Sequence, residues 1–160
     1  MIQVRNGIFE TNSSSIHAIS VYTKLPKELP DHIELRCEEY GREMGFRSLP
    51  NYIFTACAQM NRADELADML DQIGVTYTMI PSLQTITEEH DERGYLSYDH
   101  GYIDHCWDLE DFLDAILCDE GLFVCAMFNP ASQVETGNDN CEGSPDLIYG
   151  DDWYSFEKGN

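Results

Sequence analysis

The stretch that most constrains the fold is residues 108–128, which read DLEDFLDAILCDEGLFVCAMF. Its first half predicts an amphipathic helix over 109–118, because apolar side chains recur there at intervals of three and four residues. Asp108 is the expected N-cap, and Gly121 is expected to end the helical segment. Residues 122–128 are apolar throughout and predict the central strand of a sheet.

The chain before this stretch has the same order of helix, glycine and strand. A helical region is predicted over 51–73, opened by Pro50, with Asn61 as the cap of its second half. Gly74 is expected to end that helix, and residues 75–80 predict a strand directly after it. Sequence identity between the two copies is too low to indicate an internal repeat.

Further strands are expected nearer the N-terminus. A hairpin is predicted over 3–10, because its central Asn-Gly dipeptide tolerates the positive φ angles of a type I′ turn. Residues 16–22 are rich in β-branched and aromatic side chains, and residues 33–39 alternate between apolar and charged ones. The polar segment 87–105 predicts a long loop.

These elements predict one α+β domain over 1–160, in which a mainly antiparallel sheet carries two helical segments, about 51–73 and 109–118, on one face. The chain has 160 residues, enough for a single domain with a sizeable core. A hydrophobic content of 42% excludes an intrinsically disordered chain. From about residue 130 the sequence is rich in Gly, Asn and Asp, so we expect a loosely structured acidic tail.

The charge is strongly negative. Nine Lys and Arg residues face thirty Asp and Glu residues, a formal net charge of −21. This excludes direct binding to nucleic acid or to an anionic membrane, because both need a basic protein surface. The densest acidic run lies in and around the 109–118 helix. Its members are Asp104, Asp108, Glu110, Asp111, Asp114, Asp119 and Glu120.

Three interpretations of this acidic run remain open. It can be a solvated surface, a cation-binding surface, or a mimic of DNA phosphates that occupies the nucleic-acid channel of another protein. Duplex DNA presents one negative charge per about 1.7 Å of its axis, a density that an acidic helix with acidic flanks can approach. Our main hypothesis is an inhibitor of the anti-CRISPR or anti-restriction kind, without a cofactor, whose partner is a basic host or defence protein such as a nuclease. On this hypothesis the protein is a binding protein rather than an enzyme.

Residues 5–15 read RNGIFETNSSS. They resemble the opening R-x-G-x-F-x-[S/T]-N-S-S-S of a broad group of uncharacterised proteins from bacteriophages and Gram-positive bacteria. The resemblance covers only this opening and the strand behind it. It implies a phage or mobile-element protein that acts inside a bacterial cell, and it implies no particular chemistry.

The serine-rich segment supports an alternative function, that of a small enzyme or ligand-binding protein. Its hydroxyl and backbone N–H groups could bind an anion or a nucleotide phosphate, although a structural turn whose side chains satisfy their own backbone is the favoured interpretation. His17 would share a strand face with Ser15, but no third group that would orient a Ser–His pair can be identified. The candidate ligand-binding residues are Asn12, Ser13, Ser14, Ser15 and His17.

Metal binding is weakly indicated. His90, His100, His105 and Cys106 lie in one polar segment, and zinc accepts both residue types, but their spacing matches no zinc motif. We therefore predict no metal site. In the alternative function, His105 and Cys106 would contribute to the site formed by the serine-rich segment. Residues 138–143 resemble the start of a calcium loop that lacks its final glutamate.

The cell compartment is expected to be the bacterial cytoplasm. The first residues contain no apolar signal region, and no apolar run is long enough to cross a membrane. The six cysteines are dispersed and mostly lie in apolar or helical patterns, which indicates reduced thiols. Unpaired strand edges are compatible with a homodimer.

Overall fold

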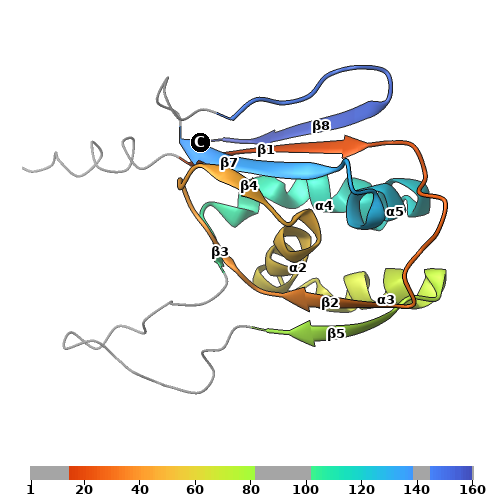
Figure 1. Cartoon of the computed structure of the whole chain (residues 1–160). Helices are drawn as coiled ribbons and strands as arrows, with labels where there is room; N and C mark the ends of the chain where they lie inside the picture. Colours follow the sequence, from red (N-terminus) through yellow and green to blue (C-terminus); the bar gives the residue numbers. More distant parts are fainter. Residues whose placement is uncertain (1–14, 82–101, 139–144, 160) are drawn as a thin grey trace, which may run out of the picture.

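The computed structural model describes residues 15–81, 102–138 and 145–159. Its largest sheet has four antiparallel strands in the order β4-β7-β1-β8 (Figure 1). The strands are β1 (Ser15–Tyr22), β4 (Gly45–Arg47), β7 (Gln133–Asn138) and β8 (Trp153–Lys158). The predicted α+β class is confirmed. The hairpin predicted over 3–10 lies outside the described residues.

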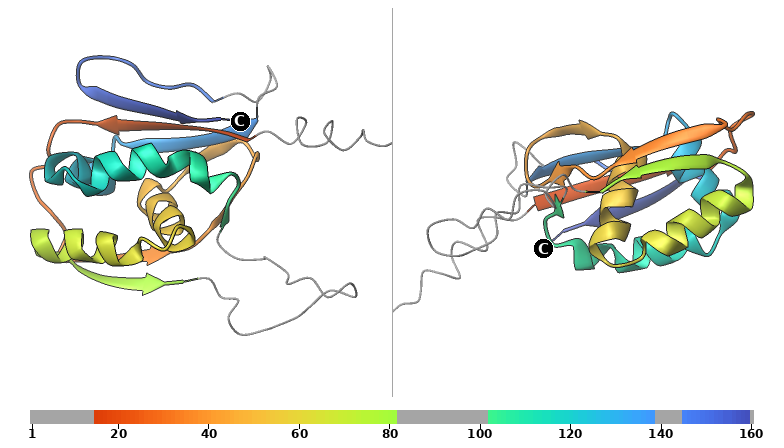
Figure 2. Two further views of the ribbon diagram at one scale, coloured as in Figure 1. Left: turned by 180° about the vertical axis from the view of Figure 1, so that it is seen from behind. Right: turned by 90° about the horizontal axis from the view of Figure 1, so that it is seen from below.

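The helices lie on one face of this sheet. They are α2 (Leu49–Gln59), α3 (Ala63–Ile73), α4 (Glu110–Leu117) and α5 (Glu120–Phe128). Figures 1 and 2 show α2, α4 and α5 between the sheet and a second, two-stranded parallel ribbon of β2 (His32–Arg36) and β5 (Thr76–Ile80), with α3 lying beside that ribbon. A short parallel pair, β3 (Glu39–Tyr40) and β6 (Tyr102–Ile103), lies at the side.

The helical region predicted over 51–73 consists of two helices. Ser48 caps α2 by accepting a hydrogen bond from the Asn51 N–H at 3.3 Å, and the expected Pro50 lies in its first turn. The prediction of Asn61 as a cap is wrong, because that residue has a positive φ of 58° in the turn and Arg62 occupies the N-cap position of α3. Gly74 ends α3 in the left-handed conformation, as predicted.

The prediction of a central strand over 122–128 is wrong. Those residues belong to α5, which Asp119 begins by accepting a hydrogen bond from the Leu122 N–H at 3.0 Å. The α5 helix is apolar on almost every side because it is packed inside the protein, so its sequence has no amphipathic period. The centre of the sheet is formed by β1 and β7.

Two smaller predictions also fail. Asp108 does not cap α4, because it lies within a 3₁₀ helix, η2 (Cys106–Leu109), that leads directly into α4. The expectation of a loose tail from residue 130 is wrong for the residues that form β7 and β8. Residues 139–144 of that tail lie outside the described residues.

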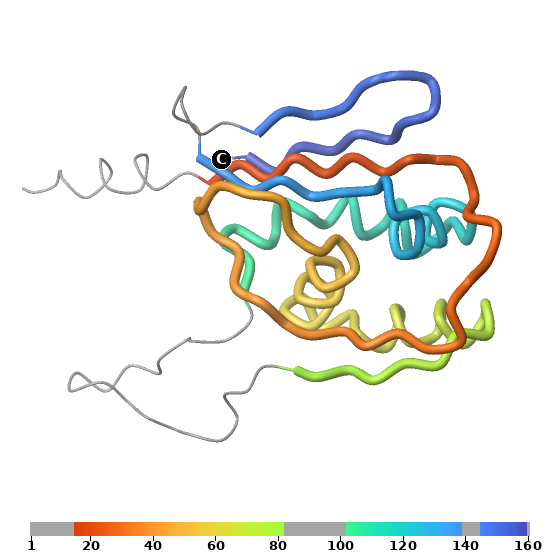
Figure 3. The backbone as a smooth tube through the Cα atoms, viewed as in Figure 1, coloured from red at the N-terminus to blue at the C-terminus, as the bar shows by residue number. Residues whose placement is uncertain are grey.

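The pairing of β1 with β8 decides which side chains meet. His17 lies opposite Lys158 and Ile19 lies opposite Phe156, so the odd-numbered β1 residues and the even-numbered β8 residues share the face that packs on the helices. The described chain starts and ends at the same edge of the molecule (Figure 3). On the opposite face of the sheet, the Ile148 N–H donates to the Ser20 hydroxyl at 3.1 Å.

The helices of the described part are all too short or too polar to cross a lipid bilayer.

Candidate functional site

Two acidic helices, α3 and α4, lie side by side and are joined by Arg62. Its guanidinium binds Glu65 of α3 and Asp114 of α4, each at 2.7 Å. Farther along, the Gln72 amide donates to the Glu120 carboxylate at 2.6 Å. These contacts bring the polar surfaces of α3, α4 and the start of α5 into one layer.

We call the exposed carboxylates of α3, α4 and the start of α5, taken together, the acidic face; those of α3 at positions 64, 68 and 71 lie on the side of the helix nearest Tyr77 of β5. Its members are Asp64, Glu65, Asp68, Asp71, Glu110, Asp111, Asp114, Asp119 and Glu120. In the described chain from residue 48 onward, the cations are Arg62 and Lys158. The Arg62 side chain is only 19% exposed and Lys158 is fully buried. The helices α3, α4 and α5 therefore present exposed carboxylates with one largely covered cation, Arg62, among them.

The structure divides the acidic residues singled out from the sequence into two groups. Glu110, Asp111, Asp114, Asp119 and Glu120 lie on the acidic face. The other two, Asp104 and Asp108, lie in the segment before α4, where their charges oppose the lowering of the Lys158 pKa.

Sequence reasoning missed the α3 members of the acidic face. Asp64, Asp68 and Asp71 follow one another at intervals of four and three residues, which places them on one side of a helix. That spacing was a usable signal. Nothing in the sequence indicated that α3 would lie against α4.

A buried polar cluster lies at the end of the sheet where β1 begins. His17 is fully buried, with Nδ1 2.7 Å from the Tyr52 hydroxyl and Nε2 2.6 Å from the Gly41 carbonyl oxygen. The Gly41 carbonyl can only accept, so Nε2 carries the proton and Nδ1 accepts from Tyr52. Burial lowers the pKa of His17 to about 4, so the imidazole is neutral.

Lys158 lies beside His17 in the same cluster. Its ammonium group donates to the Ser15 hydroxyl at 2.8 Å and to the Ser15 carbonyl oxygen at 3.2 Å. Burial lowers the pKa of Lys158. Among the residues that the structure describes, no carboxylate lies within ion-pair distance of this ammonium group.

Cys106 lies on the helix side of the cluster, while His105 lies half-exposed beside Asp104. Burial raises the pKa of the Cys106 thiol to about 12, so it is no nucleophile at neutral pH. The structure thus places Ser15 and His17 together with Lys158, whose side-chain nitrogen is hydrogen-bonded to the Ser15 hydroxyl. Of the remaining residues in the alternative site, Asn12, Ser13 and Ser14 lie outside the described chain.

The metal ligands considered from the sequence are only partly described. His90 and His100 lie outside the described residues, as does most of the calcium-like segment 138–143. Within 15–81, 102–138 and 145–159, no three His, Cys, Asp or Glu side chains are grouped so that they could hold a metal ion.

Comparisons of the chain with protein families, with curated protein sequences and with solved structures found no match.

Proposed function

We propose that the protein is an acidic inhibitor that binds a basic nucleic-acid-handling protein, such as a CRISPR or restriction nuclease, through the acidic face. The observation that carries the proposal is the gathering of carboxylates on α3, α4 and the start of α5 around a single, mostly covered cation, Arg62. The N-terminal resemblance supports a phage origin and action in the bacterial cytoplasm.

Like charges on neighbouring turns make this arrangement costly. Glu110 and Asp114 are four residues apart, as are Asp64 and Asp68. Each such pair destabilises a helix by about 0.2–0.5 kcal/mol. Solubility alone does not require this cost, because a surface of interspersed positive and negative side chains with a moderate net charge is already soluble. A surface that resembles a polyanion does require closely spaced like charges, and therefore this loss of stability.

The same surface would give the inhibitor its binding kinetics. A basic channel attracts a negative surface over a long range, which raises the association rate and makes it sensitive to salt. The partner's affinity for DNA depends on the same attraction. The acidic face and DNA would therefore compete for one channel, and both would bind more weakly as salt rises.

The proposal is tested by competition for labelled duplex DNA. A purified Cas-type effector nuclease and a purified restriction endonuclease are each loaded with DNA and titrated with the protein at low and at raised salt. We expect displacement of DNA from at least one of them. The matched control combines isosteric neutral substitutions on the acidic face: D64N, D68N, E110Q and D111N. Failure to displace DNA, or equal displacement by the neutral variant, contradicts the proposal.

A second candidate function is anion binding at the buried polar cluster. The observation that favours it is the Lys158 ammonium group, which is fully buried beside Ser15 and His17 without a close carboxylate among the described residues. A buried ammonium whose neighbouring carboxylates, Asp104 and Asp108, form no ion pair with it is costly, and a phosphate would supply a close counter-charge. A thermal-shift titration with inorganic phosphate and with nucleotides tests this candidate, and K158M is the control variant. An unchanged melting temperature counts against it.

A further inference from the structure

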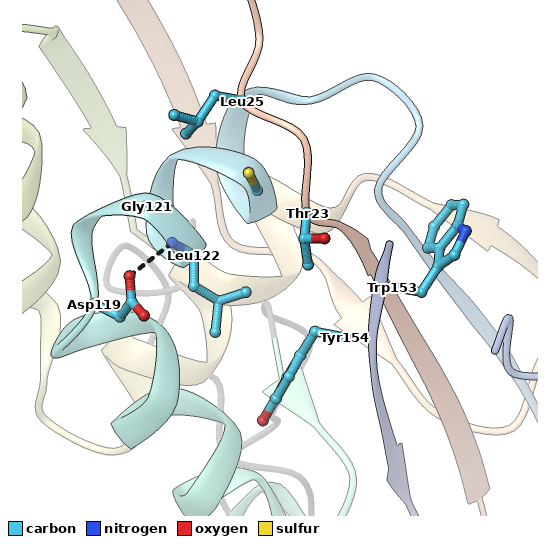
Figure 4. Close-up of a pocket in the computed structure, with 8 residues that line it drawn as sticks. Thr23, Leu25, Asp119, Gly121, Leu122, Trp153 and Tyr154 are labelled. Atoms are coloured by element: carbon cyan, nitrogen blue, oxygen red, sulfur yellow. Dashed lines mark hydrogen bonds between the residues drawn. The ribbon is translucent and has the colours of Figure 1, made fainter. Parts of the chain in front are cut away.

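A shallow groove opens beside the acidic face. It has a volume of about 540 Å³ and lies between the end of β1, the N-terminus of α5 and the start of β8 (Figure 4). Such a volume is within the range of about 300–1,000 Å³ that is common for small-molecule sites, so a single large side chain fits easily. The lining residues that matter here are Thr23, Leu25, Asp119, Leu122 and Tyr154.

The groove combines apolar walls with one carboxylate. Leu25 is 65% exposed at the rim, and Leu122 and Tyr154 are half-buried. In Figure 4 the Leu122 side chain lies between Asp119 and Tyr154. Asp119 Oδ1 accepts the Leu122 N–H at 3.0 Å. An ionised carboxylate has about four acceptor positions, so this cap leaves Asp119 able to accept further hydrogen bonds.

The groove is continuous with the acidic face. Asp119 belongs to both. The Tyr154 ring packs on Phe112 of α4, with ring centroids 6.4 Å apart. Burial raises the pKa of Tyr154, and the nearby Asp111 charge adds to this effect. A partner bound over α4 would therefore reach the groove without leaving the acidic face.

We propose that this groove receives an arginine side chain of the basic partner. The guanidinium group binds Asp119, and the aliphatic stem lies on Leu122 and Tyr154. Arginine fits because it has an apolar stem, a planar cation that pairs with carboxylates in two-point fashion, and a tendency to stack on aromatic rings. The partial positive charge at the N-terminus of α5 is outweighed by Asp119 and Glu120. This proposal rests on the function proposed above.

The test is an NMR titration of the full-length protein with an oligo-arginine peptide and with an oligo-lysine peptide of equal length. Backbone amides of Thr23, Leu122 and Tyr154 are expected to shift with the arginine peptide and much less with the lysine peptide. D119N removes the charge and keeps a good N-cap, because asparagine caps as well as aspartate. It is expected to weaken arginine-peptide binding about tenfold, since a charge that is paired inside an interface is lost.

E110Q is the matched control, because it removes the same charge from an exposed position of α4. Its expected effect is about twofold, as for other exposed charge pairs. Equal effects of the two variants, or binding without shifts at the groove amides, overturn the groove proposal and leave the proposed function intact. Failure of both peptides to bind at low salt contradicts the proposed function itself. Shifts of the groove amides on raising the protein concentration alone assign the groove to a second copy of the chain and also overturn the proposal.

Discussion

His17 is the single side chain whose protonation should most affect folding. Its pKa is about 4 in the folded protein, against 6.5 for an unperturbed histidine, because burial disfavours the charged form. The unfolded chain therefore binds a proton more readily than the folded one between these two pH values. The stability that the neutral imidazole contributes is fully present above pH 6.5 and is lost as pH falls to about 4.

We expect this loss to amount to about 3 kcal/mol. The measurement is urea unfolding at a series of pH values across that window. The carboxylates also titrate there, so the comparison is with H17Q, which removes the imidazole and keeps a polar side chain. The difference in stability between the two proteins should shrink as the pH falls. Parallel pH curves for the two proteins would show that His17 is not the responsible group.

Arg62 is the residue that holds the two acidic helices together. Its bond to Glu65 lowers the pKa of that carboxyl, and its bonds to Glu65 and Asp114 raise the pKa of Arg62 itself. R62Q leaves the carboxylates of α3 and α4 to repel one another, so we expect a loss of about 1 kcal/mol at low salt. Chemical denaturation at low and high salt measures it. A loss that is the same at both salt concentrations would mean that Arg62 acts by packing instead of by charge.

The buried polar cluster shows which part of a site a sequence can predict. Ser15 and His17 were expected on one strand face, and they are both buried there. Their partner Lys158 is 143 residues from Ser15 and could not be anticipated. Alternation along a strand is a local property, whereas the pairing of β1 with β8 depends on the whole fold.

Among the helices and strands, α5 stands where the sequence predicted a strand, and substitutions of its N-cap Asp119 test whether that helix forms. Its side chain caps α5, so D119A should destabilise the protein by about 1 kcal/mol, while D119N should have little effect on stability. Thermal or denaturant unfolding of both variants measures the difference. Equal losses for the two substitutions would contradict the capping role.

The error over 122–128 has a physical cause. An apolar run of this length fits a buried strand and a buried helix equally well, because neither shows a polar face. The deciding signal is Asp119 followed by Glu120, an N-cap with an acidic first turn, whereas Gly121, the predicted helix end, lies inside α5. The amphipathic helices α3 and α4 were predictable, since each buries one stripe and exposes the other.

At the scale of the whole molecule, the acidic face exists only because distant segments pack together. α3 and α4 are separated by more of the chain than either helix contains, and the acidic run singled out from the sequence covered only the second. Their shared surface follows from the layer of helices beneath the four-stranded sheet (Figure 1). The composition therefore predicted the sign of the surface charge, and the packing of the helices determined where on the surface that charge is concentrated.

The acidic face is expected to lower the stability of the folded protein while it provides the proposed binding surface. The molecule has a formal charge of −21, and self-repulsion of that kind destabilises the compact state. Neutralising part of the acidic face beyond the first turn of α3, with D68N and D71N, should therefore raise the melting temperature at low salt. Asp64, Glu110 and Asp111 are left unchanged, because they lie in first turns, where the helix dipole stabilises a negative charge. Added salt should raise the melting temperature of the unmodified protein more than that of the variant, because salt screens the same repulsion.

The same variant should displace DNA from the basic partner less well, although it is the more stable protein. A binding site that is retained for function often lowers the stability of the folded protein. Calorimetry and the DNA competition assay, carried out on one preparation of each protein, measure both properties. A variant that is no more stable than the unmodified protein would mean that the carboxylates are too well solvated to repel one another. In that case the cost of the acidic face would no longer argue for selection by a cationic partner.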